Sequence, residues 1–151
     1  MSHAGVAADS PAIVIGGGIS GISCARALRD AGVPARILDR GRAIGGRMAT
    51  RRLHHPGAVG HRADIGASYF TAREPSFVAA VDALVAAGVV RPWTDTFHVW
   101  QDGAMAGRRT GPMRFTAPGG LRTVVEALAD GLPVEPATTA TASVPICPAT
   151  L

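Results

Sequence analysis

The chain of 151 residues is long enough for one domain with a hydrophobic core. Its apolar share of 47% includes no run long enough for a transmembrane helix, so we expect no membrane partner. All 15 basic residues are arginine, which excludes a lysine Schiff base, and they are scattered apart from Arg47, Arg51 and Arg52. With only 5% aromatic residues, the net charge of +4 does not indicate a nucleic-acid partner.

The first part of the chain predicts a βαβ unit. Residues 1–11 are small and polar, and we expect them to be disordered. The apolar run at 12–15 predicts a buried parallel strand, followed by a glycine turn and a helix that extends to about Ala31. Residues 35–38 predict a second strand, which a right-handed crossover would place parallel to the first.

The following segments predict short elements of both kinds. Residues 41–61 predict a loop or ragged hairpin, because they are rich in glycine, arginine and histidine. The other expected elements are a strand at 64–71, a helix from Pro75 with Phe77, Val81, Leu84 and Val85 on one face and Gly88 after its end, a strand at 93–100, a turn at Asp102-Gly103, a helix after Gly119-Gly120 and a strand at 132–134. The tail at 136–151 predicts either disorder or the start of a further domain.

Cysteine and histidine residues indicate no metal site. Cys24 and Cys147 stand apart, which fits a reducing cytoplasm, and we expect Cys24 to be a small core residue of its helix. His54, His55 and His61 share one loop without a carboxylate or cysteine at ligand spacing, so we expect that loop to be solvated.

The strongest motif is a glycine loop of the form G-x-G-x-x-G between the first strand and its helix. Gly16 permits the tight turn, Gly18 allows a pyrophosphate to approach the backbone, and Gly21 allows the helix to pack closely on the strand. Ile19 and Ser20 lie in the first helical turn, whose free N–H groups attract phosphate. The alternative is a glycine-rich turn without a ligand.

Two further features support a dinucleotide site. Asp39 ends the second strand, where a carboxylate accepts hydrogen bonds from ribose hydroxyls; the alternative is a surface aspartate. The glycine loop alone fits FAD or NAD. Gly45, Gly46 and Arg47 add bare backbone and a forked cation, which suit the second phosphate of a longer dinucleotide; the alternative is a flexible basic loop.

Three strings carry a resemblance to a known family. Residues 45–52 (GGRMATRR) and 64–73 (DIGASYFTAR) resemble the bacterial renalase-like branch of the flavin amine-oxidase superfamily, as does Gly119-Gly120-Leu121 before a helix. The resemblance covers residues 12 to about 142. It implies non-covalent FAD on a split Rossmann domain, hydride transfer from a reduced small molecule to the flavin, and oxygen as acceptor. The implied substrates are dihydronicotinamide isomers or amines.

The resemblance also implies roles for individual residues. Gly16, Gly18 and Gly21 would hold the pyrophosphate, with Ile19 and Ser20 in the same loop. Asp39 would bind the adenosine ribose and Arg40 would lie on the adenine side. The residues implied near the phosphate and the isoalloxazine are Gly45, Gly46, Arg47, Gly66, Ala67 and Tyr69. No catalytic acid or base is assigned, since the cofactor carries the chemistry. Trp93, Phe97 and Trp100 would form either a substrate-pocket floor or ordinary core.

We therefore expect an α/β protein with a truncated Rossmann-type FAD/NAD(P)-binding fold and the start of a mixed α+β substrate domain. The expected divisions are the disordered residues 1–11, an FAD-binding core at 12–74, the start of the substrate domain at 75–118, a return helix and strand at 119–142 and an irregular tail at 143–151. Ala140 and Ser143 depart from the family, which has an apolar residue against the adenine. Because the chain has about half a family length, we expect a poor enzyme, unless a homodimer or a second polypeptide completes the site. The alternatives are a non-catalytic dinucleotide-binding module and a fragment of an NAD-dependent dehydrogenase.

Overall fold

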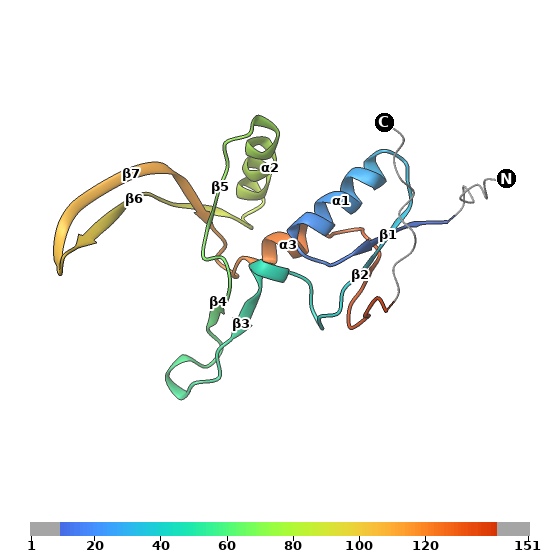
Figure 1. Ribbon diagram of the computed structural model, residues 1–151, viewed down its shortest axis with the longest axis horizontal. Helices are drawn as coiled ribbons and strands as arrows, with labels where there is room; N and C mark the ends of the chain where they lie inside the picture. The colour runs from blue at the N-terminus through green and yellow to red at the C-terminus, as the bar shows by residue number, and fades with distance from the viewer. Residues whose placement is uncertain (1–9, 142–151) are drawn as a thin grey trace.

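A computed structural model describes residues 10–141 (Figure 1). Strand β1 (Ala12–Ile15), helix α1 (Ile19–Asp30) and strand β2 (Ala35–Leu38) form the predicted βαβ unit. The two strands pair in parallel, with Ala12 opposite Ala35 and Ile15 opposite Leu38. The predicted irregular tail at 143–151, with Cys147 and Ser143, lies outside the described residues.

The parallel sheet has a third strand from the far end of the chain. Strand β8 (Val134–Glu135) pairs with β2 in parallel, which gives the order β1-β2-β8. Within residues 10–141, the second edge of β1 therefore has no partner strand. The side chains of Ile13 and Ile15 are 48% and 68% exposed, so part of this sheet also lacks a cover.

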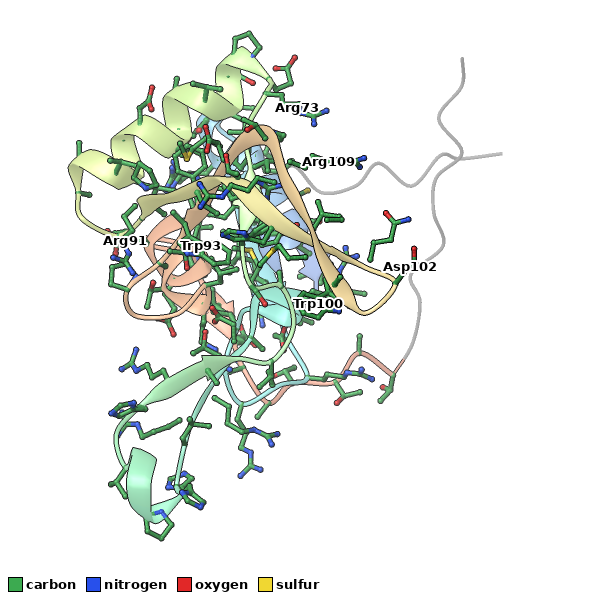
Figure 2. All side chains as sticks on the ribbon, turned by 90° about the vertical axis from the view of Figure 1, so that its left-hand side faces the viewer. Arg73, Arg91, Trp93, Trp100, Asp102 and Arg109 are labelled. Atoms are coloured by element: carbon green, nitrogen blue, oxygen red, sulfur yellow. The ribbon has the colours of Figure 1, made fainter. Side chains whose placement is uncertain are left out.

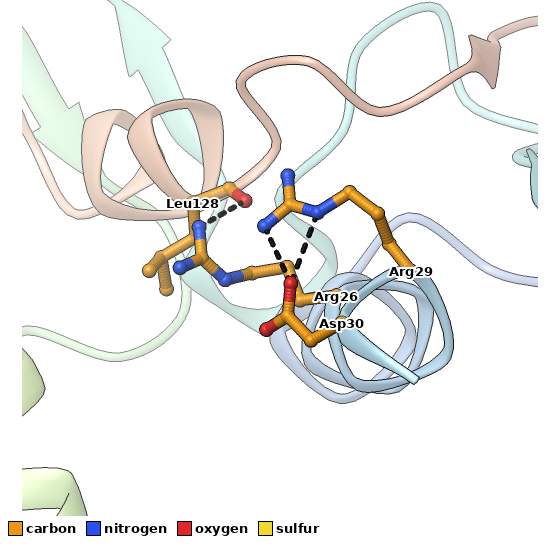
Figure 3. A network of polar contacts seen from close by, with 4 residues as sticks. All are labelled: Arg26, Arg29, Asp30 and Leu128. Carbon is orange, nitrogen blue, oxygen red and sulfur yellow. Dashed lines mark hydrogen bonds and ion pairs between the residues drawn. The ribbon is translucent and has the colours of Figure 1, made fainter. Parts of the chain in front are cut away.

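Helix α3 (Arg122–Leu128) packs beside α1 and closes the core of the parallel sheet. The fully buried side chains there include Ile22 of α1, Ile37 of β2 and Val125 of α3. At the helix ends, Arg26 Nη1 donates to the carbonyl of Leu128 at 3.1 Å (Figure 3). Arg29 and Asp30 form an exposed ion pair in the same network, which adds little stability.

The expected ragged hairpin at 41–61 contains more regular structure than a loop. It includes two short 3-10 helices, η1 (Gly46–Met48) and η2 (Pro56–Ala58), and strand β3 (Thr50–Arg52), which pairs antiparallel with β4 (Arg62–Asp64). The single strand expected at 64–71 is wrong. The chain bends after Asp64, because its carboxylate is engaged by Leu121 and Thr50, and regular pairing resumes only at β5 (Phe70–Thr71).

The central residues build a second, antiparallel sheet in the order β5-β7-β6. Strands β6 (Arg91–Gln101) and β7 (Ala104–Thr116) form a long curved hairpin that projects from the rest of the chain (Figure 1). Its turn is the predicted Asp102-Gly103 pair, both with positive φ. Helix α2 (Pro75–Ala86) buries Val81 and Leu84 as expected, whereas Phe77 is 40% exposed.

Two sequence-based expectations about burial and order are corrected. Cys24 is exposed, because the buried positions of α1 are Ile22 and Ala25 and Cys24 points away from both. The expectation of disorder is wrong for the residues just after Pro136, since the amides of Ala137 and Thr138 donate to the carbonyls of Gly41 and Asp39 at 2.8 and 2.9 Å. Among the described residues, every helix is too short or too polar to traverse a bilayer.

Candidate dinucleotide-binding site

The glycine loop joins β1 to α1 in the conformation that its glycines were expected to provide. Gly16 has a φ of +103°, and a Cβ built on Gly21 would overlap the carbonyl oxygen of Gly16, so both positions require glycine. Gly18 is the N-cap of α1. No side chain of the described chain caps this helix, and its first turn carries no acidic residue. Its N–H groups are therefore free for an anion.

Asp39 is tied to the glycine loop. Its Oδ2 accepts from the amide of Gly17 at 2.5 Å and its Oδ1 accepts from the amide of Gly41 at 2.6 Å. A Cβ on Gly17 would lie 2.5 Å from Ile44 Cγ2 and 3.0 Å from Asp39 Oδ2. Sequence reasoning did not select Gly17, although its position between Gly16 and Gly18 was the available signal. Gly17 holds the carboxylate in place rather than facing a ligand.

The second glycine segment lies directly against the first. The amide of Gly45 donates to the carbonyl of Gly17 at 2.9 Å, and Gly45 forms a parallel bridge with Gly18. A Cβ on Gly46 would be 3.2 Å from the Cα of Gly18, and the φ of Gly46 is +52°. The glycine loop and the Gly45-Gly46 segment thus pack backbone against backbone, because neither has a side chain at the contact.

A cleft of about 570 Å³ opens at the carboxyl ends of β1 and β2. In open α/β sheets, this is the edge at which ligands bind. Four of the predicted site residues lie there: Gly16, Asp39, Arg40 and Gly46. The other lining residues are Ile15, Leu38, Gly41, Ala43, Ala49, Thr138, Thr139 and Ala140.

A second hollow of about 380 Å³ is lined by five more of the predicted residues, Ile19, Arg47, Gly66, Ala67 and Tyr69, together with Met48 and Phe70. The amide of Ala67 donates to the carbonyl of Arg47 at 2.9 Å. A Cβ on Gly66 would overlap that same carbonyl oxygen, so glycine is needed for this contact. Gly18, Gly21 and Gly45 form the packing around these two spaces, and Ser20 is exposed and lines neither.

Residues 138–140 form a wall of the cleft that sequence reasoning did not predict. They follow β8, and the backbone hydrogen bonds from Ala137 and Thr138 to Gly41 and Asp39, in the loop after β2, hold them beside Asp39. Their composition gave no periodic signal. Only the family pattern pointed to Ala140, which does line the cleft.

Aromatic side chains lie next to the second hollow, on the long hairpin. The ring of Tyr69 is 6.0 Å from those of Trp93 and Phe97, and the guanidinium of Arg114 lies 4.0 Å from the ring centre of Phe97. Trp93 and Trp100 are 50% and 68% exposed, so the expectation that they are ordinary core is wrong (Figure 2). The described residues leave this face of the hairpin uncovered.

The described residues include no group of three or more histidine, cysteine, aspartate or glutamate side chains placed to hold a metal ion. In the histidine loop, His54, His55 and His61 are exposed, and His55 Nδ1 accepts from the amide of Gly57 at 3.3 Å. The described site offers backbone donors, one carboxylate and arginines, which can bind and orient a phosphate-bearing ligand.

The parallel strands, the glycine loop and the acid after β2 define a Rossmann-like dinucleotide-binding fold. Residues 14–84 match the family described as "NAD(P)-binding Rossmann-like domain".

Solved structures are similar over part of their length. A mutant of 2-methyl-3-hydroxypyridine-5-carboxylic acid oxygenase has a TM-score of 0.54 at 19% identity, over 84% of this chain and 31% of that one. For 2,6-dihydroxypyridine-3-hydroxylase from Arthrobacter nicotinovorans the TM-score is 0.47 at 19% identity, over 83% and 29%. For putrescine oxidase bound to putrescine it is 0.45 at 24% identity, over 67% and 21%. The chain spans less than a third of each, and the oxygenase supports the fold alone.

Proposed function

We propose that this chain is the front, FAD-binding part of a flavin-dependent oxidoreductase. One observation carries the proposal: Gly16, Asp39 and Gly46 line one cleft, and Arg47, the residue after Gly46, lines a second hollow. A mononucleotide would occupy only the cleft beside Asp39. A longer dinucleotide such as FAD would occupy both the cleft and the second hollow.

The residues of the cleft beside Asp39 fit the ADP half of FAD. The uncapped N-terminus of α1 suits the pyrophosphate, and the contact between Gly18 and Gly46 keeps side chains out of its path. Each oxygen of Asp39 accepts one backbone hydrogen bond and retains one acceptor position for a ribose hydroxyl. Arg40 and residues 138–140 would lie on the adenine side.

The second hollow supports FAD over NAD as the preferred cofactor. Arg47 would hold the flavin-side phosphate, and Gly66, Ala67 and Tyr69 would contact the isoalloxazine. FAD supplies a hydride acceptor that oxygen reoxidises. The chain's own part would be to bind this group and orient it.

The finer assignment is the renalase-like branch, with a dihydronicotinamide isomer or an amine as the small-molecule substrate and the cytoplasm as its location. The exposed aromatic group around Tyr69 would border that substrate. In this assignment residues 12–74 and 119–142 serve the cofactor and residues 75–118 begin the substrate domain. The competing functions are a non-catalytic dinucleotide-binding module and part of an NAD-dependent dehydrogenase.

We also propose that residues 1–151 alone are a poor enzyme. The hollow expected for the flavin is lined by exposed Arg47, Gly66 and Tyr69, so water would reach an isoalloxazine placed there. Further protein surface over this hollow would be needed to exclude it.

The test is to express residues 1–151 and compare FAD with NAD by thermal stabilisation, flavin stoichiometry and peroxide production with amines and dihydronicotinamide isomers. We expect stabilisation by FAD, incomplete flavin occupancy and negligible turnover. Gly18→Ala is the matched variant, since its Cβ would be 3.8 Å from the nearest atom, the Cα of Gly46, and would lie in the pyrophosphate path. Stabilisation by NAD alone contradicts the cofactor proposal. Steady peroxide production by the monomer contradicts the proposal of a poor enzyme.

A further inference from the structure

Three arginines from separate parts of the chain line a small polar pocket outside the dinucleotide site. Two of them are placed by the β3–β4 hairpin, whose register puts Arg52 directly opposite Arg62. Like charges at directly opposed strand positions repel each other. Arg62 Nη1 donates to the carbonyl of Gly119 at 3.0 Å, which orients this side chain toward the start of α3 but leaves its charge unneutralised.

The third arginine comes from α3, which lies beside β3 in Figure 1. The amide of Arg122 donates to Thr50 Oγ1 at 3.1 Å, which fixes the helix against the hairpin. The side chain of Arg122 packs on Gly45, where a Cβ would be 3.3 Å from Arg122 Cγ. Its Nε is buried and has no hydrogen-bond partner among the described residues. A buried, unpaired donor on a charged group is costly, so the charge of this guanidinium is incompletely compensated by the residues described.

Nearby acidic groups do not neutralise the three arginines. Glu126 lines the same pocket, but no ion pair within 4.0 Å joins it to an arginine in the described part of the chain. The carboxylate of Asp64 accepts from Thr50 Oγ1 and from the amide of Leu121 instead. Three positive charges and one negative charge thus surround a space of about 190 Å³. The pocket is lined by Thr50, Arg52, Arg62, Gly119, Arg122, Thr123 and Glu126.

We propose that this pocket binds a small tetrahedral oxoanion of the phosphate class. Guanidinium groups donate several hydrogen bonds in a fixed plane and match phosphate oxygens better than any other side chain does. The space suits a small anion and shares no lining residue with the dinucleotide cleft, although Arg62 and Gly119 also line a neighbouring hollow of about 430 Å³. The site therefore goes beyond the proposed function. Its occupant would stabilise the junction of hairpin and helix.

The experiment titrates the 151-residue chain with inorganic phosphate by calorimetry, and compares melting temperatures in phosphate and in chloride at equal ionic strength. We expect saturable phosphate binding and a higher melting temperature in phosphate. Arg122→Gln should weaken this binding by about tenfold or more, because it removes a charged donor from a partly buried site. Arg52→Gln should also weaken it and should raise stability in chloride, since it removes the repulsion from Arg62.

Arg51→Gln is the matched control. It makes the same charge change on the neighbouring residue of β3, which faces the other side of the hairpin and does not line the pocket. We expect its phosphate affinity to equal that of the unchanged chain. Equal loss in Arg51→Gln and Arg122→Gln would overturn the proposal, because it would indicate a general charge effect. Loss in Arg47→Gln without loss in Arg122→Gln would overturn it too, since phosphate would then bind at the dinucleotide site. Arg52 is exposed on a short hairpin, so its variant provides the test if Arg122→Gln does not fold.

Discussion

Asp39 is the residue on which the proposed cofactor site depends most. Its carboxylate is held by two backbone amides, one from the glycine loop and one from the turn after β2. Both bonds fix the side chain before any ligand arrives, so little rotamer entropy is lost on binding. The charge also repels a ribose 2′-phosphate, which disfavours NADP. The spacing from the glycine loop predicted this aspartate, and the structure shows how its carboxylate is held.

Asp39→Ala should weaken FAD binding by roughly 1–3 kcal/mol, because the ribose hydroxyls lose their acceptor. The quantity to measure is the FAD dissociation constant, with the free energy of unfolding alongside it, since the amides of Gly17 and Gly41 also lose a partner. Asp82→Ala, on the exposed side of α2, is the control and should change neither. An unchanged dissociation constant in a folded Asp39→Ala protein would remove this aspartate from the site.

At the scale of elements, one buried hydroxyl joins the β3–β4 hairpin to α3. Thr50 is 7% exposed; its Oγ1 donates to Asp64 at 2.6 Å and accepts from the amide of Arg122 at 3.1 Å. Asp64 also accepts from the amide of Leu121 at 2.8 Å. The start of α3 is therefore held by a threonine and an aspartate from distant strands.

Thr50→Val should lower the free energy of unfolding by about 1–3 kcal/mol, because at nearly constant volume it removes the acceptor for the amide of Arg122 and one of the two donors to Asp64. Urea unfolding measures this. Thr116→Val, at a half-buried position of β7 with no side-chain hydrogen bond to another described residue, should be close to neutral. Equal stability of the two variants would show that the hydroxyl is dispensable.

Local patterns predicted the elements well, because the βαβ unit and the hairpin turn depend on near neighbours along the chain. Long-range interactions decided the rest. The bend after Asp64 follows from its bonds to Thr50 and Leu121, and the ordered backbone at Ala137 and Thr138 follows from pairing beside β2. The sequence predicted the glycine loop and the Gly45-Gly46 segment as separate motifs. It did not predict their contact, which depends on how the chain folds between them.

For the whole molecule, the open edge of β1 matters most. The amides of Ala12 and Gly16 donate to Pro34 and Leu38 of the neighbouring segment. Since successive amides of a strand point in opposite directions, those of Ile13 and Ile15 face the edge without a partner strand in residues 10–141. Such an edge favours addition of another strand.

We therefore expect the amides of Ile13 and Ile15 to exchange with solvent much faster than that of Val14 in a dilute sample of the chain. Hydrogen exchange followed by nuclear magnetic resonance measures each amide separately. Protection that rises with protein concentration would indicate pairing between copies. Strong protection of all three amides at every concentration would contradict the open edge.

The cleft has walls that lie at very different distances from one another along the chain. The glycine loop and the turn after β2 are close in sequence, so they can meet early, whereas residues 138–140 arrive only when β8 pairs with β2 across most of the chain. A ligand that contacts both walls therefore stabilises the pairing of β8 with β2. Its binding free energy adds directly to the closure of that long loop, and the occupied protein holds its final strand more firmly than the empty one does.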